Sequence, residues 1–286
     1  PVGIPLVIEG HVKTGMRIAV NGVFGNLGVA SAALLTGYLV DQSGWRLAFI
    51  WPGLVTIVIG VGYAILVSRG HSKEPSADEG GASPATAIAG NLQLGRNLLI
   101  RIFAIVFFST AVGSLVFQST TFSLPKIFDE RLGDLAISAT LVGWYAFVVF
   151  AIASMGQLVV GYLLDRFSIK AIFVGVAIFQ VVFFLAMIGR VGSIALLISI
   201  AFMLVVFGQI PINDVLVGRV TKTEWRSRAY GLRYVIGFTV MASAVPMVAW
   251  IYARWSFDAL FVVLAAAGAG ILIAVMMLPR QLASKA

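Results

Sequence analysis

Few residues of this sequence have side chains that could do chemistry, and the most distinctive of them share one short segment. The segment reads GYLLDRFSIK, residues 161–170, and places Asp165 beside Arg166, with Lys170 close behind, between two long apolar runs. A carboxylate and two cations at the edge of hydrocarbon can form charge-assisted hydrogen bonds or contact lipid headgroups. The pattern predicts a short polar connection between two membrane spans.

Catalytic and metal-binding sets of residues are absent from the rest of the sequence. It has no Cys, and its two His residues, His11 and His71, fall in predicted loops. It also lacks a Gly-rich phosphate loop, a metal-ligand cluster and a nucleophile–base set. A membrane enzyme would need several His, Asp or Glu residues gathered at the membrane face. The sequence therefore predicts a protein that is not an enzyme and holds no metal and no cofactor.

One group of polar residues near the end of a predicted span could form an inner gate. In FGQIPIND, residues 207–214, a proline loosens the helix between Gln209 and the pair Asn213 and Asp214. The alternative is that Asp214 is an interfacial acid paired with Arg219 or Arg228. The sequence leaves both interpretations open.

The acidic residues also bear on energy coupling, because none lies at the centre of a complete predicted span. A carboxyl group that binds a coupling proton has to be buried, and exposed acids do not qualify. A coupling proton, if transport uses one, is therefore expected at Glu9 or before Pro1, and not at Asp214.

Uncharged polar residues on the predicted spans are candidates for lining a substrate path. They are Asn21, Asn26, Gln118, Tyr145, Gln157, Tyr234 and Thr239. In lipid, such side chains also hydrogen-bond neighbouring helices, at about 1 kcal/mol each. Interhelical bonding is therefore the alternative for each of them.

The elements that position these residues follow from composition. The sequence is 60% hydrophobic and 11% charged, against about 45–50% and about 25% in globular domains. Crossing a bilayer takes about 20 apolar residues, and the runs of that length are 17–40, 46–68, 98–122, 138–163, 170–189, 193–215, 229–252 and 257–278. Because lipid cannot satisfy backbone groups, each run should be a helix. The predicted fold class is an all-α integral membrane protein.

The polar segment between the second and third runs divides the chain. Residues 69–96 are rich in Gly, Ser and Pro and are predicted to link the end of one bundle, 1–68, to a second bundle, 97–286. Most of the 20 Lys and Arg residues lie in this linker or in loops on its side. The positive-inside rule then places the linker and the C-terminus in the cytoplasm and residues 123–137 outside. Because the basic residues are spread over these loops, the net charge of +8 indicates membrane topology and not nucleic-acid binding.

Short matches at a spacing of about 210 residues indicate two parallel repeats, as in one large class of secondary transporters. The matched pairs are VASA 29–32 with MASA 241–244, Trp45 with Trp255, and IPLV 4–7 with IPIN 210–213. With this spacing, about 110 residues, roughly three and a half spans, are expected before Pro1.

These features together resemble the major facilitator superfamily. GYLLDRFSIK is similar to that family's loop signature, Gly-x-x-x-Asp-Arg, which begins here at Gly161, in its position between the eighth and ninth spans. LGVASAALLTGYL followed by GWRLAF resembles its fifth span and the following turn. The chain would then run from the end of the fourth span to the twelfth, in two pseudo-symmetric bundles of which the first is incomplete. Where drug antiporters of the family carry Gly-Pro, this chain has Ala32-Ala33.

The resemblance implies a secondary active transporter that moves a small organic solute across the bacterial inner membrane by alternating access. We expect a monomer whose partners are the bilayer and its solute. The alternatives are a proton-driven drug or metabolite antiporter and a transporter-like sensor. The resemblance also implies that Asp165 contacts the opposite bundle, and the repeat places its partner at residues 14–18. Arg17 could add a bond there, while Arg166 and Lys170 would stay near lipid headgroups.

Overall fold

The computed structural model describes residues 14–69, 96–221 and 223–278, and within these ranges the chain is entirely helical, without strands. The helices are α2 (Thr14–Ser43), α3 (Leu47–Arg69), α5 (Arg96–Arg131), α6 (Ala139–Leu164), α7 (Ile169–Ala186), α8 (Gly192–Val220), α9 (Thr223–Arg254) and α10 (Phe257–Met276). A short 3-10 helix, η1 (Gly133–Leu135), precedes α6. Eight helices are long and apolar enough to cross a membrane, which confirms the predicted fold class.

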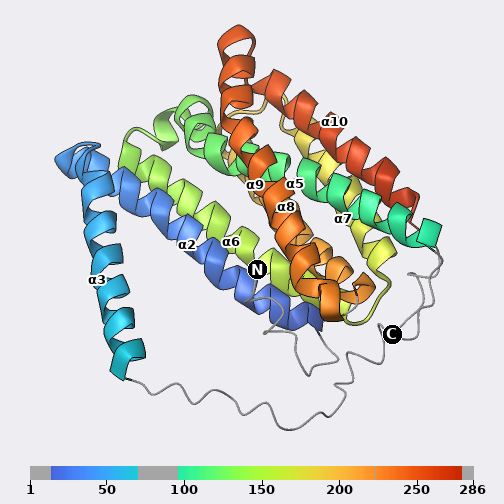
Figure 1. Cartoon of the computed structure of the whole chain (residues 1–286). Coiled ribbons are helices and arrows are strands. Elements are labelled where there is room, and N and C mark those ends of the chain that lie inside the picture. Colours follow the sequence, from blue (N-terminus) through green and yellow to red (C-terminus); the bar gives the residue numbers. More distant parts are fainter. Residues whose placement is uncertain (1–13, 70–95, 222, 279–286) are drawn as a thin grey trace.

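Successive helices alternate in direction, so the C-terminal end of each helix lies at the same end of the bundle as the N-terminal end of the next helix. Helix α2 lies antiparallel beside α6, and α6 in turn packs on α8 (Figure 1). Helices α5 and α9 form a second pair, and α7 and α10 a third. Asp165, after α6, and Asp41, near the end of α2, mark opposite ends, which we call the Asp165 end and the Asp41 end.

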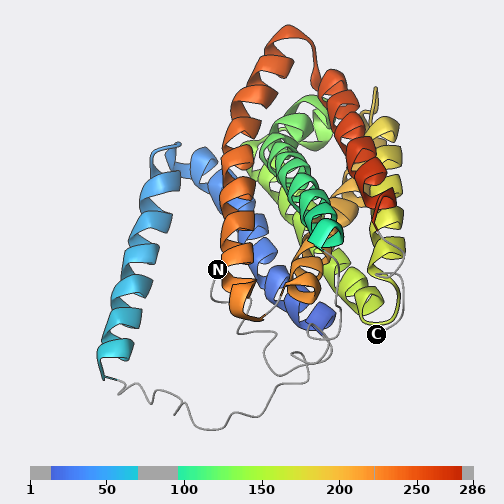
Figure 2. The same ribbon diagram turned by 45° about the vertical axis from the view of Figure 1, so that its right-hand side comes forward.

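Helix α3 stands apart from the other helices (Figures 1 and 2). It touches α2 near the turn that joins them, and its side chains are exposed along most of its length. These side chains are apolar, as expected for a helix that faces lipid or further helices. Trp45 and Trp255, which the sequence repeat pairs, each lie two residues before a helix, α3 and α10 respectively.

Two clusters of buried apolar side chains form the core. The cluster toward the Asp41 end is built around phenylalanines, and Phe184, Phe202 and Phe261 join α7, α8 and α10 at ring-centroid distances of 5.5–6.3 Å. These distances are typical of favourable aromatic pairs. The other cluster lies toward the Asp165 end and includes Ile18 of α2 and Tyr230 of α9.

The prediction that residues 123–137 form a loop is wrong for the first part of this segment, because α5 continues through Pro125 to Arg131. The missing proline N–H removes one backbone hydrogen bond. In the next turn, Lys126 pairs with Asp129 at 2.7 Å and with Glu130 at 3.6 Å. Pairs at these spacings stabilise a helix, so the charged turn extends it beyond the apolar run.

The predicted loop between 215 and 229 is also wrong, because α8 continues to Val220 and α9 begins at Thr223. Both errors have one cause, since charged residues that extend a helix past the apolar run were assigned to loops. Most of the predicted linker 69–96 lies outside the described residues, as do Glu9, His11 and His71.

Candidate functional site

Asp165 closes one end of the contact between α2 and α6. Its Oδ1 accepts a hydrogen bond from the Gly15 amide at 3.0 Å, and its Oδ2 accepts one from the Met16 amide at 3.1 Å. Both amides belong to the first turn of α2, where N–H groups lack helical partners and the helix dipole favours negative charge. The predicted contact between Asp165 and residues 14–18 is therefore confirmed. Arg17 is exposed and forms no ion pair with Asp165, so the predicted contribution of that cation is wrong.

The two cations of the same segment contact other elements. Arg166 stacks over the ring of Tyr162, with 4.3 Å between the guanidinium carbon and the ring centroid. Lys170 Nζ donates to the carbonyl oxygens of Met276, at 2.8 Å, and Leu278, at 2.5 Å. A cation at these last carbonyls stabilises the C-terminal end of α10. The sequence did not predict this contact with α10, and the proximity of Lys170 to lipid headgroups stays a prediction.

Asp41 forms the corresponding contact at the opposite end of the same helix pair. It accepts a hydrogen bond from the Thr140 amide at 2.6 Å and a second one from the Thr140 hydroxyl. Thr140 lies in the first turn of α6. Each helix of the pair therefore provides a carboxylate to the N-terminal end of the other. This contact was not predicted from the sequence.

Glycines bring the backbones of α2 and α6 together between the two carboxylates. A Cβ atom at Gly15 would lie 2.6 Å from the Gly161 carbonyl oxygen, and one at Gly143 would lie 2.7 Å from the Ala33 carbonyl oxygen. Distances below 3.0 Å do not fit a side chain without movement of the opposite backbone. Gly161, predicted as part of the loop signature, thus serves close helix packing, as small residues do in membrane bundles.

Two predicted path residues lie inside this interface. Gln157 is fully buried against Gly22, and both polar atoms of its side chain lack a hydrogen-bond partner among the described residues. Asn26, one turn from Gly22, is 6% exposed, and its Nδ2 also lacks a partner there. The middle of the α2–α6 interface therefore contains buried amides that the packing does not satisfy.

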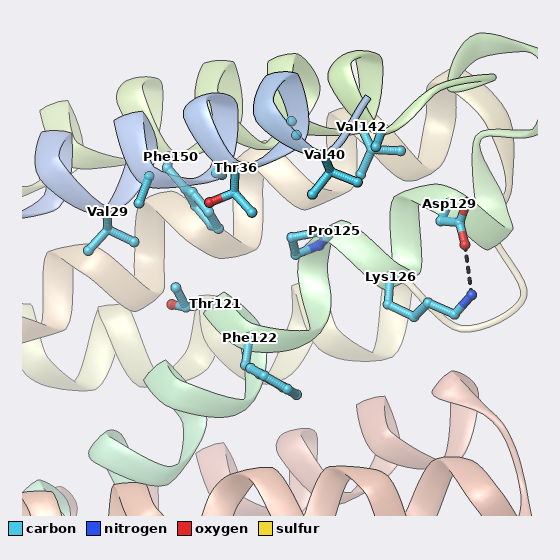
Figure 3. Close-up of a pocket in the computed structure, with 15 residues that line it drawn as sticks. Val29, Thr36, Val40, Thr121, Phe122, Pro125, Lys126, Asp129, Val142 and Phe150 are labelled. Atoms are coloured by element: carbon cyan, nitrogen blue, oxygen red, sulfur yellow. Dashed lines mark hydrogen bonds and ion pairs between the residues drawn. The ribbon is translucent and has the colours of Figure 1, made fainter. Parts of the chain in front are cut away.

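A cavity of 590 Å³ lies between α2, α5 and α6 toward the Asp41 end. In Figure 3, residues of α2 such as Thr36 line it on one side, and Thr121 and Pro125 of α5 line it on the other. The Lys126–Asp129 ion pair lies beside it. Most of the lining is hydrocarbon, so this cavity offers few groups for recognising a polar solute.

A second cavity, of 230 Å³, lies between α5, α8 and α9 and is more polar. Arg233 lines it at 8% exposure and pairs through Nη1 with Asp214, which is 4% exposed. Arg233 Nε also donates to Thr110 Oγ1 at 3.3 Å. Gln209 and Asn213 complete its polar lining from α8. A buried charge pair within the spans is costly and is usually functional.

The surroundings of Asp214 differ from those that the sequence predicts. The acid is not interfacial, and Arg233 of the next helix is its partner, while the exposed Arg228 stacks over Trp225 at 4.8 Å. Asp214 lies near the end of the span Gly192–Gly218 and not at its centre, as predicted, but it is buried, which the sequence did not indicate. Arg233 was counted among the loop cations and missed as a site residue. The signal was its position just before the uncharged run from Tyr234 to Trp250.

Of the remaining predicted path residues, one lines a cavity and the others line neither cavity. Tyr234 lines the 230 Å³ cavity, together with Gln209 and Asn213 of the predicted gate. Asn21 and Thr239 are exposed, whereas Gln118 and Tyr145 are half-buried and line neither cavity. The described residues contain no group of three His, Cys, Asp or Glu that could hold a metal ion.

Comparison with known families gives one match. The family model described as Major Facilitator Superfamily matches residues 9–134 and 106–285, which together span most of the chain. No curated protein matches the chain.

Proposed function

We propose that this chain, which belongs to the Major Facilitator Superfamily of membrane transporters, is a secondary active transporter that moves a small organic solute by alternating access. Members of the family are transporters and not enzymes. The α2–α6 interface is the observation that carries the proposal, because alternating access needs an interface that can separate at either end.

The polar contacts of this interface suit such separation. At each end, one carboxylate binds amides in the first turn of the opposite helix. Water can replace the carboxylate on these amides, because N-terminal amides are not part of the helical hydrogen-bond ladder. Either end can therefore open without unwinding a helix.

The unsatisfied amides of Gln157 and Asn26 also favour opening. A buried polar group without a partner costs about 1–3 kcal/mol. Separation of α2 from α6 would hydrate these side chains and relieve that cost. The closed interface is therefore stabilised by the carboxylate contacts at its two ends and by close backbone packing. The buried amides in its middle destabilise the closed state.

We propose that the Asp165 end faces the cytoplasm of a bacterium and that residues 1–68 and 97–286 belong to two bundles. The sequence asymmetry of Lys and Arg supports this orientation. Single cysteines at Ser76 and Asp129, probed in intact cells with an impermeant thiol reagent, test it. Labelling is expected at 129 alone, and labelling at 76 alone would contradict the orientation.

Flux of a panel of solutes into proteoliposomes containing the full-length protein tests the function. Gly37→Leu is expected to abolish flux, because even a Cβ at Gly37 would collide with the Ala139 carbonyl oxygen of α6. Gly62→Leu is the matched control on α3, where a Cβ meets nothing within 4 Å.

The same flux assay separates the alternatives. Flux that depends on an imposed pH gradient would support the proton-driven antiporter. Solute binding without flux under any gradient would instead support a sensor and contradict the transport proposal.

A further inference from the structure

The cavity around Arg233 is bordered by several hydrogen-bond donors. Of the contacts that Arg233 makes to described residues, Nη1 binds Asp214 and Nε binds Thr110, so Nη2 has no hydrogen-bond partner among them. Gln209 Nε2 is likewise without a partner there, in a residue that is 4% exposed and lines the cavity. A guanidinium nitrogen and a buried amide nitrogen therefore border the same small space without a hydrogen-bond partner among the described residues.

A third donor converges on the same place. A Cβ atom at Gly113 of α5 would lie 2.8 Å from Gln209 Nε2 and 3.9 Å from Asn213 Nδ2. Both amide nitrogens therefore point to the space beside Gly113, which lines the cavity. The Asn213 oxygen points elsewhere, because it accepts a hydrogen bond from Ser109 at 3.1 Å.

The described residues that line the cavity include no carboxylate. Asp214 balances the charge of Arg233, but Asp214 is not among the residues that line the cavity. Thr110 Oγ1, which does line it, already accepts from Arg233 Nε. The cavity thus presents a guanidinium and two amide N–H groups, with the carboxylate outside its lining.

The rest of the lining is mostly apolar, although it includes the hydroxyl of Ser114. Phe117, Val206, Ile210 and Met241 contribute hydrocarbon, and Tyr234 adds an aromatic ring. At 230 Å³ the cavity is smaller than the roughly 300–1,000 Å³ that drug-sized ligands occupy. Its occupant must therefore be small, or place only one end there.

We propose that this cavity, the Arg233 pocket, binds the carboxylate of a small organic monoanion that has an apolar body. The inference rests on the proposed transport function and names the class of its substrate. Guanidinium groups match carboxylates in geometry and bind them by charge-assisted hydrogen bonds. Asp214 competes with the bound carboxylate for Arg233, which keeps binding weak enough for release.

Binding of benzoate to the purified full-length protein tests the proposal, with benzamide as the uncharged probe of the same shape. We expect benzoate to bind at least about tenfold more tightly than benzamide, the difference that one charge-assisted hydrogen bond provides. Equal affinities, or no binding of benzoate, would overturn the proposal.

Variants of the ion pair sharpen this test. Arg233→Gln alone would leave Asp214 buried and unpaired, which destabilises the fold. The pair is therefore removed in two steps. Asp214→Asn should tighten benzoate binding by freeing Arg233, and adding Arg233→Gln should reduce benzoate affinity to that of benzamide. Weaker binding in Asp214→Asn, or benzoate preference that persists in the double variant, would overturn the assignment.

Two further results separate this inference from the proposed function. Lys126→Gln combined with Asp129→Asn removes an exposed ion pair away from the pocket and should leave benzoate affinity unchanged. A protein that transports an uncharged solute but does not bind benzoate would refute the inference alone. A protein that binds benzoate as predicted but transports no solute would refute the proposed function alone.

Discussion

Asp165→Asn is the most direct test of the contact that closes the Asp165 end. In the closed interface both carboxylate oxygens accept hydrogen bonds, from the Gly15 and Met16 amides. Asparagine keeps one oxygen as an acceptor but places an NH₂ group at the other position and removes the charge. We expect this end to open more often, and the Asp41 end to open less often, if the two ends alternate.

The size of the shift follows from the position of Asp165 at a helix N-terminus. A carboxylate there contributes about 0.3–1 kcal/mol when exposed and up to about 2 kcal/mol when partly buried. Asp165 is half-buried, and one of its two acceptors survives in the variant. A loss of about 1.4 kcal/mol or less corresponds to at most a tenfold change in the ratio of open to closed molecules.

Thiol modification measures that ratio, because the sequence contains no cysteine and one introduced cysteine can report alone. Ile18→Cys is a suitable reporter, since Ile18 is 5% exposed in the closed interface near Asp165. Its modification rate should rise by up to about tenfold in the Asp165→Asn background. Arg17→Gln is the matched control and should leave the rate unchanged, because Arg17 forms no ion pair with Asp165.

An unchanged rate at the Ile18→Cys reporter, together with unchanged transport, would refute the assigned role of Asp165. The residue would then only end α6 and begin a turn. An equal rise in the Arg17→Gln control would also contradict the reasoning, since it would assign the effect to surface charge and not to the two hydrogen bonds.

Three further predictions concern neighbouring contacts. Asp41→Asn should shift the equilibrium in the opposite direction and speed modification of a cysteine at the buried Ala146, because a neutral amide binds Thr140 more weakly than the carboxylate does. Gly15→Ala should lower the melting temperature, because its Cβ would lie 2.6 Å from the Gly161 carbonyl oxygen. Gly25→Ala is the matched control: its Cβ would meet nothing within 4 Å, so the substitution should raise the free energy of unfolding by about 0.5–1 kcal/mol. Lys170→Met should destabilise the fold by about 1 kcal/mol in thermal unfolding, because it removes both bonds to the end of α10, while transport orientation stays unchanged.

The sequence was sufficient for the features that depend on length and order along the chain. Each span is an apolar run, and the cost of unsatisfied backbone groups in lipid leaves helix as the outcome. The partner of Asp165 was also predictable, because the family resemblance implies a contact with the opposite bundle and the repeat relates the loop to the start of α2. The second inference therefore needed the resemblance as well as the position of a residue in the sequence.

Features that depend on how each helix is rotated could not be predicted. Helix α8 is apolar on all sides, so its sequence does not reveal which face meets α9, and hence that Asp214 meets Arg233. Arg233 lies inside the predicted span 229–252 but was counted with the basic residues that indicate topology, although its side chain is 8% exposed within the bundle. The donor-rich cavity depends on three helices meeting, which no single segment encodes.

The unequal lengths of the helices have a consequence for the surrounding lipid. Helix α5 has 36 residues and would extend about 54 Å if straight, whereas α7 has 18 residues and extends about 27 Å. A hydrocarbon layer of about 30 Å fits neither length, so α5 must tilt or project beyond it, while α7 must stand nearly upright and thin the bilayer beside it. Each Å of mismatch between helix length and bilayer thickness costs a fraction of a kcal/mol, so lipids with shorter acyl chains should gather around α7. The acyl-chain length of the surrounding lipid should therefore affect how easily the helix bundle changes conformation.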